Sequence, residues 1–334
     1  MTKVIKLALA ASVLAGGLSA NDVVTGSGSS FAYSIYKSWT ESYYKATGKK
    51  VDYISKGSSK GIKDAKARLV NYGGTDAPLP PKELKKSNLY QFPSVVGAIT
   101  MGYNIPGVNN LKLSRAAIVA ISEGKVGYWD EKIITEENPG LKLPHKKVTF
   151  VHRSDGSGTT FSYTYYLSVV SKEWRHAYGA KKSLNWPGRQ HVGGNKNTGV
   201  ASLIKQTPYS VGYIDYADAV NNHILMADVE NKAGRYITPN LASFQAGAAK
   251  ASLDPKKDFF AMIADPAGVK SYPIITTTFV LVPAEKPQTD KKVTAFFDWA
   301  FKHGQKNATD LGYVPLPSSL TDKIEAYWEA KGIK

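Results

Sequence analysis

Three short runs of glycine and serine constrain this chain most, because each one follows an apparent strand and opens an apparent helix. They read Gly-Ser-Gly-Ser-Ser-Phe at 26–31, Gly-Ser-Ser-Lys-Gly at 57–61 and Arg-Ser-Asp-Gly-Ser-Gly-Thr-Thr at 153–160. Glycine lets the backbone turn tightly, and the N–H groups and dipole at a helix start favour negative charge. Arg153 adds a planar, permanently charged group that suits an oxyanion. Three such junctions that converged would enclose an anion.

Apolar periodicity predicts strands and helices that alternate along the chain, which is typical of an α/β fold. Phe31, Ile35, Trp39 and Tyr43 recur every four residues and predict a helix with one apolar face. Strands are predicted at 51–54, 95–103, 148–152 and 273–281, and helices near 115–122 and 293–301. Two further helices should carry their apolar faces on Ile62, Ala65 and Leu69, and on Phe161, Tyr165 and Val169.

The N-terminus has the pattern of a secretory signal peptide. Lys3 and Lys6 precede an apolar stretch at 7–18, and small residues follow up to Ala20. The stretch is shorter than the roughly 20 residues that a membrane span needs, so we predict a cleaved signal peptide at 1–20 and export to the periplasm. The chain has no cysteine, which excludes disulfides, thiolate metal sites and lipid attachment to a cysteine.

The formal charge of +16 becomes +14 when the two signal lysines are removed, and such a charge raises the question of nucleic acid. The basic residues are dispersed rather than gathered into one block. Pairs of lysines occur at Lys49-Lys50, Lys85-Lys86, Lys146-Lys147, Lys181-Lys182 and Lys291-Lys292. We therefore predict a solvated basic surface with no nucleic-acid partner, whose positive field still attracts anions.

Each glycine and serine run also has a purely structural interpretation, since Ser and Gly cap and turn helices in many α/β proteins. None of the runs matches the phosphate loop of nucleotide-binding proteins or the dinucleotide fingerprint. His152, Asp155 and Ser157 contain the residue types of a hydrolase triad, but they lie too close in sequence to contact one another, and Asp155 breaks the nucleophile-elbow pattern. The six histidines show no metal spacing. We expect no metal, no cofactor and no catalysis.

Ordered motifs over nearly the whole chain resemble the periplasmic phosphate-binding proteins of the phosphate-specific ABC importer. The motifs are Thr25–Phe31, Gly57–Ser59, Gly74–Leu79, Gln91–Pro93, Asn104–Gly107 and Arg153–Thr159. The similarity extends through Asn138–Pro144, Gly212–Tyr213, Thr276–Phe279 and Phe297–Ala300. Each motif is weak to moderate alone, and their order and spacing make the resemblance specific.

The resemblance implies a type II periplasmic binding fold with two domains, each a mixed sheet flanked by helices, joined by two crossover segments. The crossovers should fall near Asn104 and Thr276. We therefore predict domain I at 21–103 plus 277–334 and domain II at 104–276. The ligand would lie in the cleft between the domains, and hinge closure would complete its shell.

The resemblance also implies which residues hold phosphate. These ligand contacts are Ser30 and Phe31 through backbone N–H groups, Ser58, Asp76, Arg153, Ser157, Gly158 and Thr159. Asp155 corresponds to an aspartate that pairs with the binding arginine, and Gly156 supports the same loop. A buried carboxylate at Asp76 can accept a hydrogen bond from protonated phosphate, whereas fully ionised sulfate has no proton to offer. Three departures from the family pattern, Ser30 in place of the usual Thr, Ala32 and Lys60, leave this set intact, and we expect Lys60 to point into solvent.

The function expected from these observations is a monomeric receptor, not an enzyme, that captures inorganic phosphate and delivers it to a membrane permease and ATPase. Two alternatives remain open at this stage. One is a receptor for another oxyanion, such as sulfate, molybdate or a phosphonate, and the other is a periplasmic phosphoester hydrolase. A surface adhesion or signalling role is permitted by the basic exterior but not indicated by it.

Overall fold

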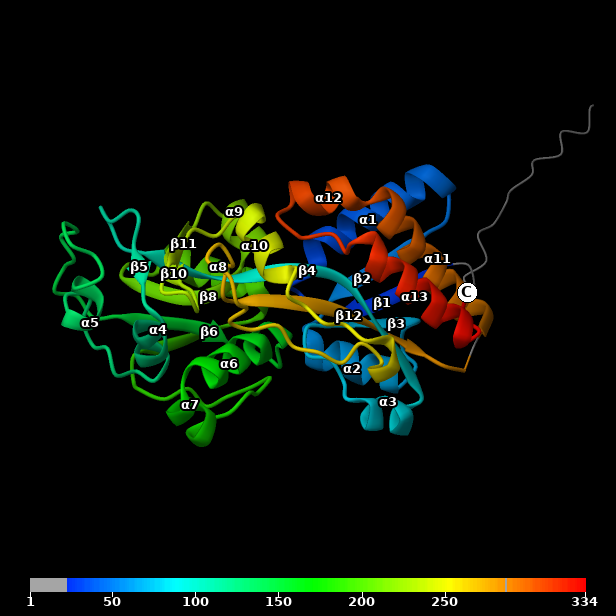
Figure 1. Ribbon diagram of the computed structural model, residues 1–334, viewed down its shortest axis with the longest axis horizontal. Coiled ribbons are helices and arrows are strands. Elements are labelled where there is room, and N and C mark those ends of the chain that lie inside the picture. The colour runs from blue at the N-terminus through cyan, green and yellow to red at the C-terminus, as the bar shows by residue number, and fades with distance from the viewer. Residues whose placement is uncertain (1–22, 286) are drawn as a thin grey trace, which may run out of the picture.

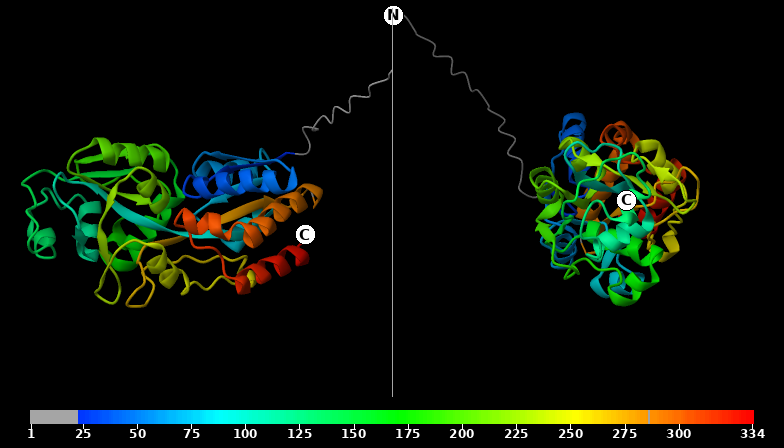
Figure 2. Two further views of the ribbon diagram at one scale, coloured as in Figure 1. Left: turned by 90° about the horizontal axis from the view of Figure 1, so that it is seen from above. Right: turned by 90° about the vertical axis from the view of Figure 1, so that its left-hand side faces the viewer.

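The protein consists of two lobes that lie side by side, as the computed structural model shows (Figures 1 and 2). The structure describes residues 23–285 and 287–334, so the predicted signal peptide lies outside it. One path of hydrogen-bonded strands runs through both lobes, in the order β2-β1-β3-β12-β4-β8-β6-β7. Within the described residues, no helix is both long and apolar enough to cross a membrane.

The first lobe begins with three parallel strands, β1 (Val24–Gly28) between β2 (Val51–Ser55) and β3 (Tyr72–Thr75). Two helices connect them, α1 (Tyr33–Thr47) and α2 (Ser58–Lys66). The apolar face predicted for α1 is confirmed, because Ile35, Trp39 and Tyr43 are buried. In α2 the prediction is wrong for Leu69, since the helix ends at Lys66 and Leu69 is 69% exposed.

Two long strands pass between the lobes (Figure 1). β4 (Leu89–Asn104) pairs with β12 (Ile275–Pro283) up to Ala98 and with β8 (Ser210–Asp215) from Ile99 onwards. A single strand therefore contributes to the sheet of both lobes, and it changes partner in mid-course. The predicted domain limits at 103/104 and 276/277 stay a prediction.

The second lobe places β6 (Thr149–Arg153) between β8 and β7 (His191–Gly194), with all three parallel. Helix α6 (Gly158–Val170) follows β6, and α8 (Lys196–Gln206) follows β7. The face predicted for α6 is wrong. Val169 is 44% exposed, and the helix instead buries Tyr163 and Tyr166 together with its small hydroxyl residues.

The remaining elements complete the two lobes. They are α3 (Pro81–Ser87), β5 (Lys112–Leu113), α4 (Arg115–Ser122), α5 (Lys132–Thr135), α7 (Lys172–Ala177), α9 (Tyr216–Asn221), β9 (Leu225–Met226), β10 (Asp228–Glu230), β11 (Tyr236–Ile237), α10 (Leu241–Ala248), η2 (Pro255–Lys257), α11 (Pro287–His303), α12 (Gln305–Asp310) and α13 (Ser318–Ala330). The helices predicted near 115–122 and 293–301 correspond to α4 and α11. β5, β10 and β11 form a separate three-stranded sheet.

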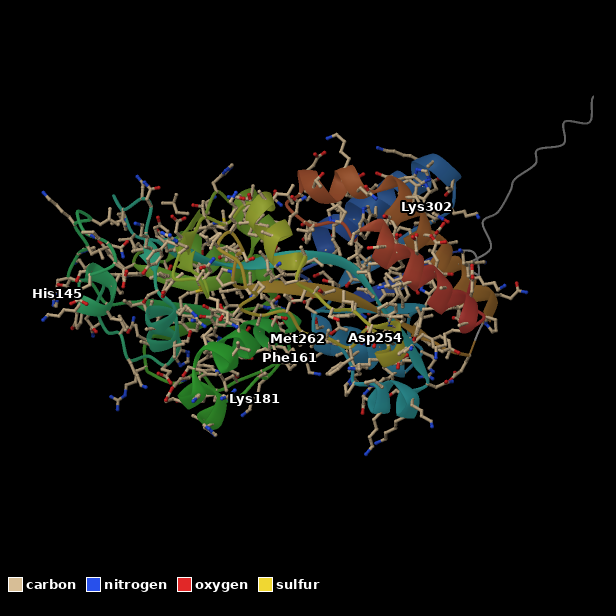
Figure 3. All side chains as sticks on the ribbon, in the orientation of Figure 1. His145, Phe161, Lys181, Asp254, Met262 and Lys302 are labelled. Carbon is tan, nitrogen blue, oxygen red and sulfur yellow. The ribbon has the colours of Figure 1, made fainter. Side chains whose placement is uncertain are left out.

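Segment 254–260 leaves the second lobe and packs on the first, where Figure 3 labels Asp254. The Asp258 carbonyl accepts a hydrogen bond from Gln91 Nε2 (3.0 Å), and its carboxylate accepts one from the Tyr327 hydroxyl (2.8 Å). Phe259 is fully buried and packs edge-on against the Tyr327 ring. The lobes are thus linked at a third place besides β4 and β12.

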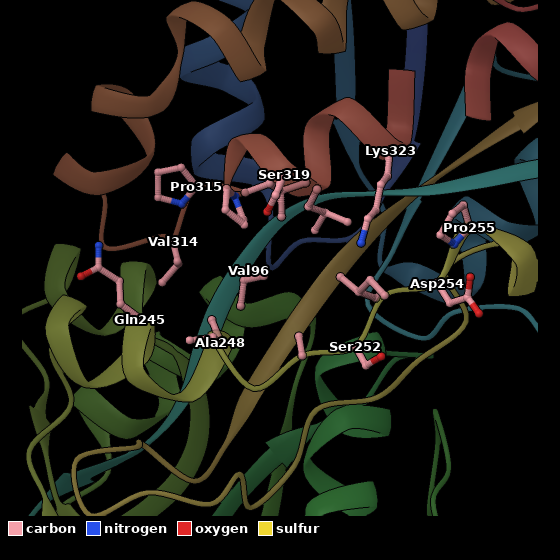
Figure 4. Close-up of a pocket in the computed structure, with 16 residues that line it drawn as sticks. Val96, Gln245, Ala248, Ser252, Asp254, Pro255, Val314, Pro315, Ser319 and Lys323 are labelled. Atoms are coloured by element: carbon pink, nitrogen blue, oxygen red, sulfur yellow. The ribbon is translucent and has the colours of Figure 1, made fainter. Parts of the chain in front are cut away.

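A cavity of about 670 Å³ lies beside this segment (Figure 4). Its walls come from β4, from the chain after α10 and from the chain around α13, and its lining includes Val96, Ala248, Leu253, Val314 and Lys323. None of the residues predicted to hold the ligand lines it.

Candidate functional site

The three glycine and serine runs meet where the two lobes touch. The parallel strands β1 and β2 place the loops that follow them at one edge of the first lobe's sheet. β6 runs in the opposite sense in the second lobe, and the loop that follows it meets them from the other side. Across the interface the Ser59 backbone N–H donates to the Gly156 carbonyl (3.1 Å). Gly158 fits against the first lobe only because it lacks a side chain: a Cβ there would lie 2.3 Å from Ser58 Oγ and 2.7 Å from Asp76 Oδ2.

Asp76 is a buried acid of the first lobe, 1% exposed. Its Oδ1 accepts hydrogen bonds from Ser29 Oγ and Thr278 Oγ1, both at 2.7 Å, and its Oδ2 accepts one from Ser58 Oγ (3.2 Å). Burial raises the pKa of Asp76, and the three hydroxyl donors and the positive charge of Arg153 oppose this rise. These hydroxyls fix the carboxyl in place, and no described residue forms an ion pair with it.

Arg153 is the buried cation of the second lobe, 4% exposed at the end of β6. It donates from Nε to Asp155 Oδ1 (2.7 Å) and from Nη2 to Asp155 Oδ2 (2.6 Å). Burial raises the pKa of Asp155, but the ion pair with Arg153 outweighs it and the net pKa is lowered. The third side of the guanidinium donates from Nη1 to Asn197 Oδ1 (2.7 Å). Arg153 is therefore held on several sides before any ligand binds.

Three hydroxyl groups at the interface, those of Ser157, Ser30 and Thr159, can donate a hydrogen bond to a ligand. Ser157 caps α6 by accepting from the Thr160 N–H (3.0 Å), and its own N–H donates to the Lys182 carbonyl (2.8 Å). Ser30 Oγ accepts from the Asn197 N–H, and Thr159 Oγ1 accepts from Asn197 Nδ2, both at 3.4 Å. A hydroxyl that accepts a bond still has its own hydrogen to give. These hydrogens add to the backbone N–H groups of Gly158 and Thr159 at the start of α6, since the next N–H, that of Thr160, is taken by the Ser157 hydroxyl.

Phe31 lies beside this set with its ring buried rather than open to the interface. The ring packs edge-on against Tyr313, whose hydroxyl donates to the Phe31 carbonyl. This packing fixes the backbone at the end of the first glycine and serine run. Lys60 is exposed, as predicted.

Three residues at the site were not predicted from the sequence. Ser29 and Thr278 hold Asp76, and Asn197 joins Arg153 and Thr159 to Ser30 across the interface. Asn197 has no exposed surface, and it follows a Gly-Asn-Lys run between β7 and α8. That run lies between a strand and a helix, as the three glycine and serine runs do, so the same pattern could have predicted Asn197 as a site residue.

The residues of the rejected hydrolase triad have other partners. His152 contacts the Arg153 carbonyl through Nδ1 (2.9 Å) and His191 through Nε2 (3.0 Å), while Asp155 pairs with Arg153. Burial lowers the pKa of His152. In the part of the chain that the structure describes, no group of three or more His, Cys, Asp or Glu is placed to hold a metal ion. The arrangement is suited to binding an anion rather than to activating a nucleophile.

Comparison with known proteins shows the family to which this chain is similar. Residues 15–303 match the family model of the PBP superfamily domain. The phosphate-binding protein PstS of Pasteurella multocida is 41% identical over 312 residues, which cover 92% of this chain and 90% of that protein. The protein of the same name from Methanocaldococcus jannaschii is 36% identical, covering 89% of this chain and 83% of its own length.

Solved structures share the fold at low sequence identity. The periplasmic phosphate-binding protein PfluDING, solved with bound phosphate, gives a TM-score of 0.71 at 18% identity over 91% of this chain and 93% of that one. The phosphate-binding protein of Stenotrophomonas maltophilia gives the same TM-score at 20% identity and the same coverage. The predicted mixed α/β binding-protein fold is confirmed. The chain belongs to the PBP superfamily and, within it, to the family of the phosphate-binding proteins PstS.

Proposed function

We propose that this protein binds inorganic phosphate between its lobes and delivers it to an ABC importer. The relatives named as phosphate-binding proteins, about 40% identical over most of the chain, support this assignment. The predicted contacts are Ser30, Phe31, Ser58, Asp76, Arg153, Ser157, Gly158 and Thr159. Export by the predicted signal peptide would bring the chain to the periplasm, as a monomer that docks on a membrane permease and its ATPase.

The observation that carries the proposal is an acid inside an anion site. Arg153, the first turn of α6 and the donating hydroxyls attract any oxyanion, whereas Asp76 repels one unless the anion brings a proton. Hydrogen phosphate brings that proton at neutral pH and sulfate does not. Asp76 therefore supplies selectivity, and Arg153 supplies attraction.

The test is calorimetric titration of the exported chain with phosphate and with sulfate. We expect one phosphate per chain and no measurable sulfate binding. Asp76→Asn should weaken phosphate binding about tenfold, because it loses a charge-assisted hydrogen bond, and it should admit sulfate. Asp64→Asn is the matched control, because Asp64 is another buried acid of this lobe and bonds to Ser27 and Lys56 outside the site.

Two results would contradict the proposal. Equal affinity of the parent protein for sulfate and phosphate would indicate a general oxyanion receptor, and molybdate and a phosphonate extend the same comparison. Turnover of a chromogenic phosphate ester would indicate a hydrolase, and we expect none alongside stoichiometric phosphate binding.

A further inference from the structure

The residues of the interlobe site are shielded from solvent in this arrangement of the lobes. Asp76, Ser157 and Thr159 are at most 1% exposed. The hydrogen bond from the Ser59 N–H to the Gly156 carbonyl joins the two lobes on the same side. An anion therefore cannot reach these groups, or leave them, unless the lobes move apart on the side of the site.

The cavity of about 670 Å³ lies on the opposite face of the strands that join the lobes. In β12 the Thr278 hydroxyl bonds to Asp76 and the Thr276 hydroxyl bonds to α6, both at 2.7 Å, so these side chains point to the site. Side chains alternate along a strand, so Thr277 points the other way. Val96 of β4 lies opposite Thr277, shares its face and lines the cavity. We call this space the rear cavity.

Both lobes contribute walls to the rear cavity (Figure 4). On one side it is lined by α10 and the chain that follows, including Gln245, Ala248 and Ser252. On the other side it is lined by residues 314–317 and by the start of α13. The width of the cavity therefore depends on the angle between the lobes. A rotation about β4 and β12 that parts the lobes at the site brings these two walls together.

A strap of chain, residues 249–255, connects the two walls. All of its residues except Lys250 line the rear cavity. Just beyond the strap, Asp258 and Phe259 hold the chain on the first lobe. Both have a positive φ, 48° and 55°, which residues other than glycine keep only where their surroundings fix them. The strap therefore limits how far the lobes can separate at the rear, and it leaves them free to approach each other there.

We infer that the rear cavity is the space into which the lobes move when the site opens, so that its free volume controls how readily the site exchanges its ligand. With the site closed the cavity is wide, and a volume of this size accommodates an added phenyl group. With the site open the same group would be caught between the approaching walls, at the cost of an overpacked core. The inference rests on the proposed function only in that phosphate is the ligand whose release is measured.

The first test fills the rear cavity and measures phosphate release by stopped flow. Ala248→Phe should slow release about tenfold, because the open arrangement becomes less accessible. Ser252→Phe, which enters from the strap, should have the same effect and covers the case that the first variant fails to fold. Ala242→Phe is the matched control, since it makes the same change in α10 at an exposed residue outside the cavity. It should release phosphate at the parent rate.

The second test needs no ligand. The chain has no cysteine, so Ala242→Cys and Asp322→Cys place two spin labels on exposed residues of the opposite walls, in α10 and α13. In phosphate-free protein the distance between the labels should include a population shorter than that of the phosphate-bound protein. Adding Ala248→Phe should remove this short population. The comparison of the two phosphate-free proteins holds even if the proposed phosphate binding fails.

Three results would overturn the inference. The first is release at the parent rate from both cavity-filling variants once they are shown to be folded. The second is equally slow release from Ala242→Phe, which would mean a general effect of the added ring on α10. The third is a label distance in phosphate-free protein that is unchanged or longer, which would mean that the rear walls do not approach each other. Absence of phosphate binding by the parent protein would contradict the proposed function, and the label distances would then decide this inference alone.

Discussion

The two lobes each bring a carboxylate to their interface, and the surroundings of the two differ: Asp76 is buried, whereas Asp155 is partly exposed. In the first lobe Asp76 is surrounded by the hydroxyls of Ser29, Ser58 and Thr278, and its pKa is raised. In the second lobe Asp155 forms a two-point ion pair with Arg153, and its pKa is lowered. The same residue type is thus placed once among neutral donors and once against a cation.

The difference shows how one site both attracts and selects an anion. Asp155 orients the guanidinium and offsets part of its charge, so it is already committed within its own lobe. Asp76 is held by groups that do not neutralise it, so it remains able to meet a ligand proton. Attraction and selection are therefore divided between the two sides of the interface.

The strongest way to break this division is to remove the cation. Arg153→Gln should weaken phosphate binding roughly 100-fold or more, because charge-assisted hydrogen bonds are lost and Asp155 is left facing the site. Calorimetry of the folded variant measures the effect. Arg189→Gln, which changes an exposed arginine of the same lobe, is the control and should bind like the parent. A loss of less than about threefold would contradict the role given to Arg153.

The difference between Asp76 and Asp155 should also appear in the free energy of unfolding. Asp155→Asn should lower the free energy of unfolding by about 2 kcal/mol, because it leaves Arg153 buried with less counter-charge, although partial exposure of Asp155 reduces the cost. Asp76→Asn should raise it at neutral pH, because a buried ionised group becomes a neutral one. Urea unfolding without phosphate measures both changes. Changes of the same sign would contradict the comparison.

The stability of the parent protein should depend on pH in two opposite ways, one from each of these two carboxyl groups. The folded-state pKa of Asp76 is raised, so its contribution to stability is full below the ordinary aspartate pKa and is lost as pH rises through the raised value. The folded-state pKa of Asp155 is lowered, so its contribution is present above the ordinary pKa and is lost as pH falls through the lowered value. Asp76→Asn should remove only the first slope, and Asp155→Asn only the second.

The smallest of these effects should come from Asn197, which connects the two sides. Asn197→Ala removes the side-chain bonds to Arg153 and Thr159 and should weaken phosphate binding about fivefold, mainly by faster release. Stopped-flow measurement of dissociation detects this change. The neighbouring exposed residue gives the control Asn195→Ala, which should release phosphate at the parent rate. A changed association rate with unchanged release would contradict a holding role for Asn197.

The sequence predicted the parts of the site that depend on local pattern. Glycine and serine between a strand and a helix specify the loop conformation, and the parallel strands β1 and β2 bring the first two runs to one edge. The third run follows β6, which runs in the opposite sense in the other lobe, so its meeting with the first two did not follow from local pattern. The contact between Thr278 and Asp76 could not be predicted in this way. It depends on the antiparallel pairing of β12 with β3, in which Phe279 lies opposite Thr75. Register between distant strands has no local sequence signal.

The wrong face predicted for α6 has a related cause. Phe161, Tyr165 and Val169 share a side of that helix, and their spacing alone indicates a buried stripe. The helix is enclosed on nearly all its other sides, where Ser162 and Thr164 are buried through hydrogen bonds that a hydropathy pattern counts as polar. As a result, the stripe of Phe161, Tyr165 and Val169 is the most exposed side of α6.

The shared strand β4 determines how the molecule can be divided. A fragment cut at 104–276 would lose residues 99–103 and leave β8 from Val211 to Asp215 without its antiparallel neighbour. An open inner edge of this kind recruits other chains, so the fragment would tend to aggregate rather than fold. The second lobe therefore depends for its solubility on a strand that begins in the first lobe, so the two lobes cannot be produced as separate proteins.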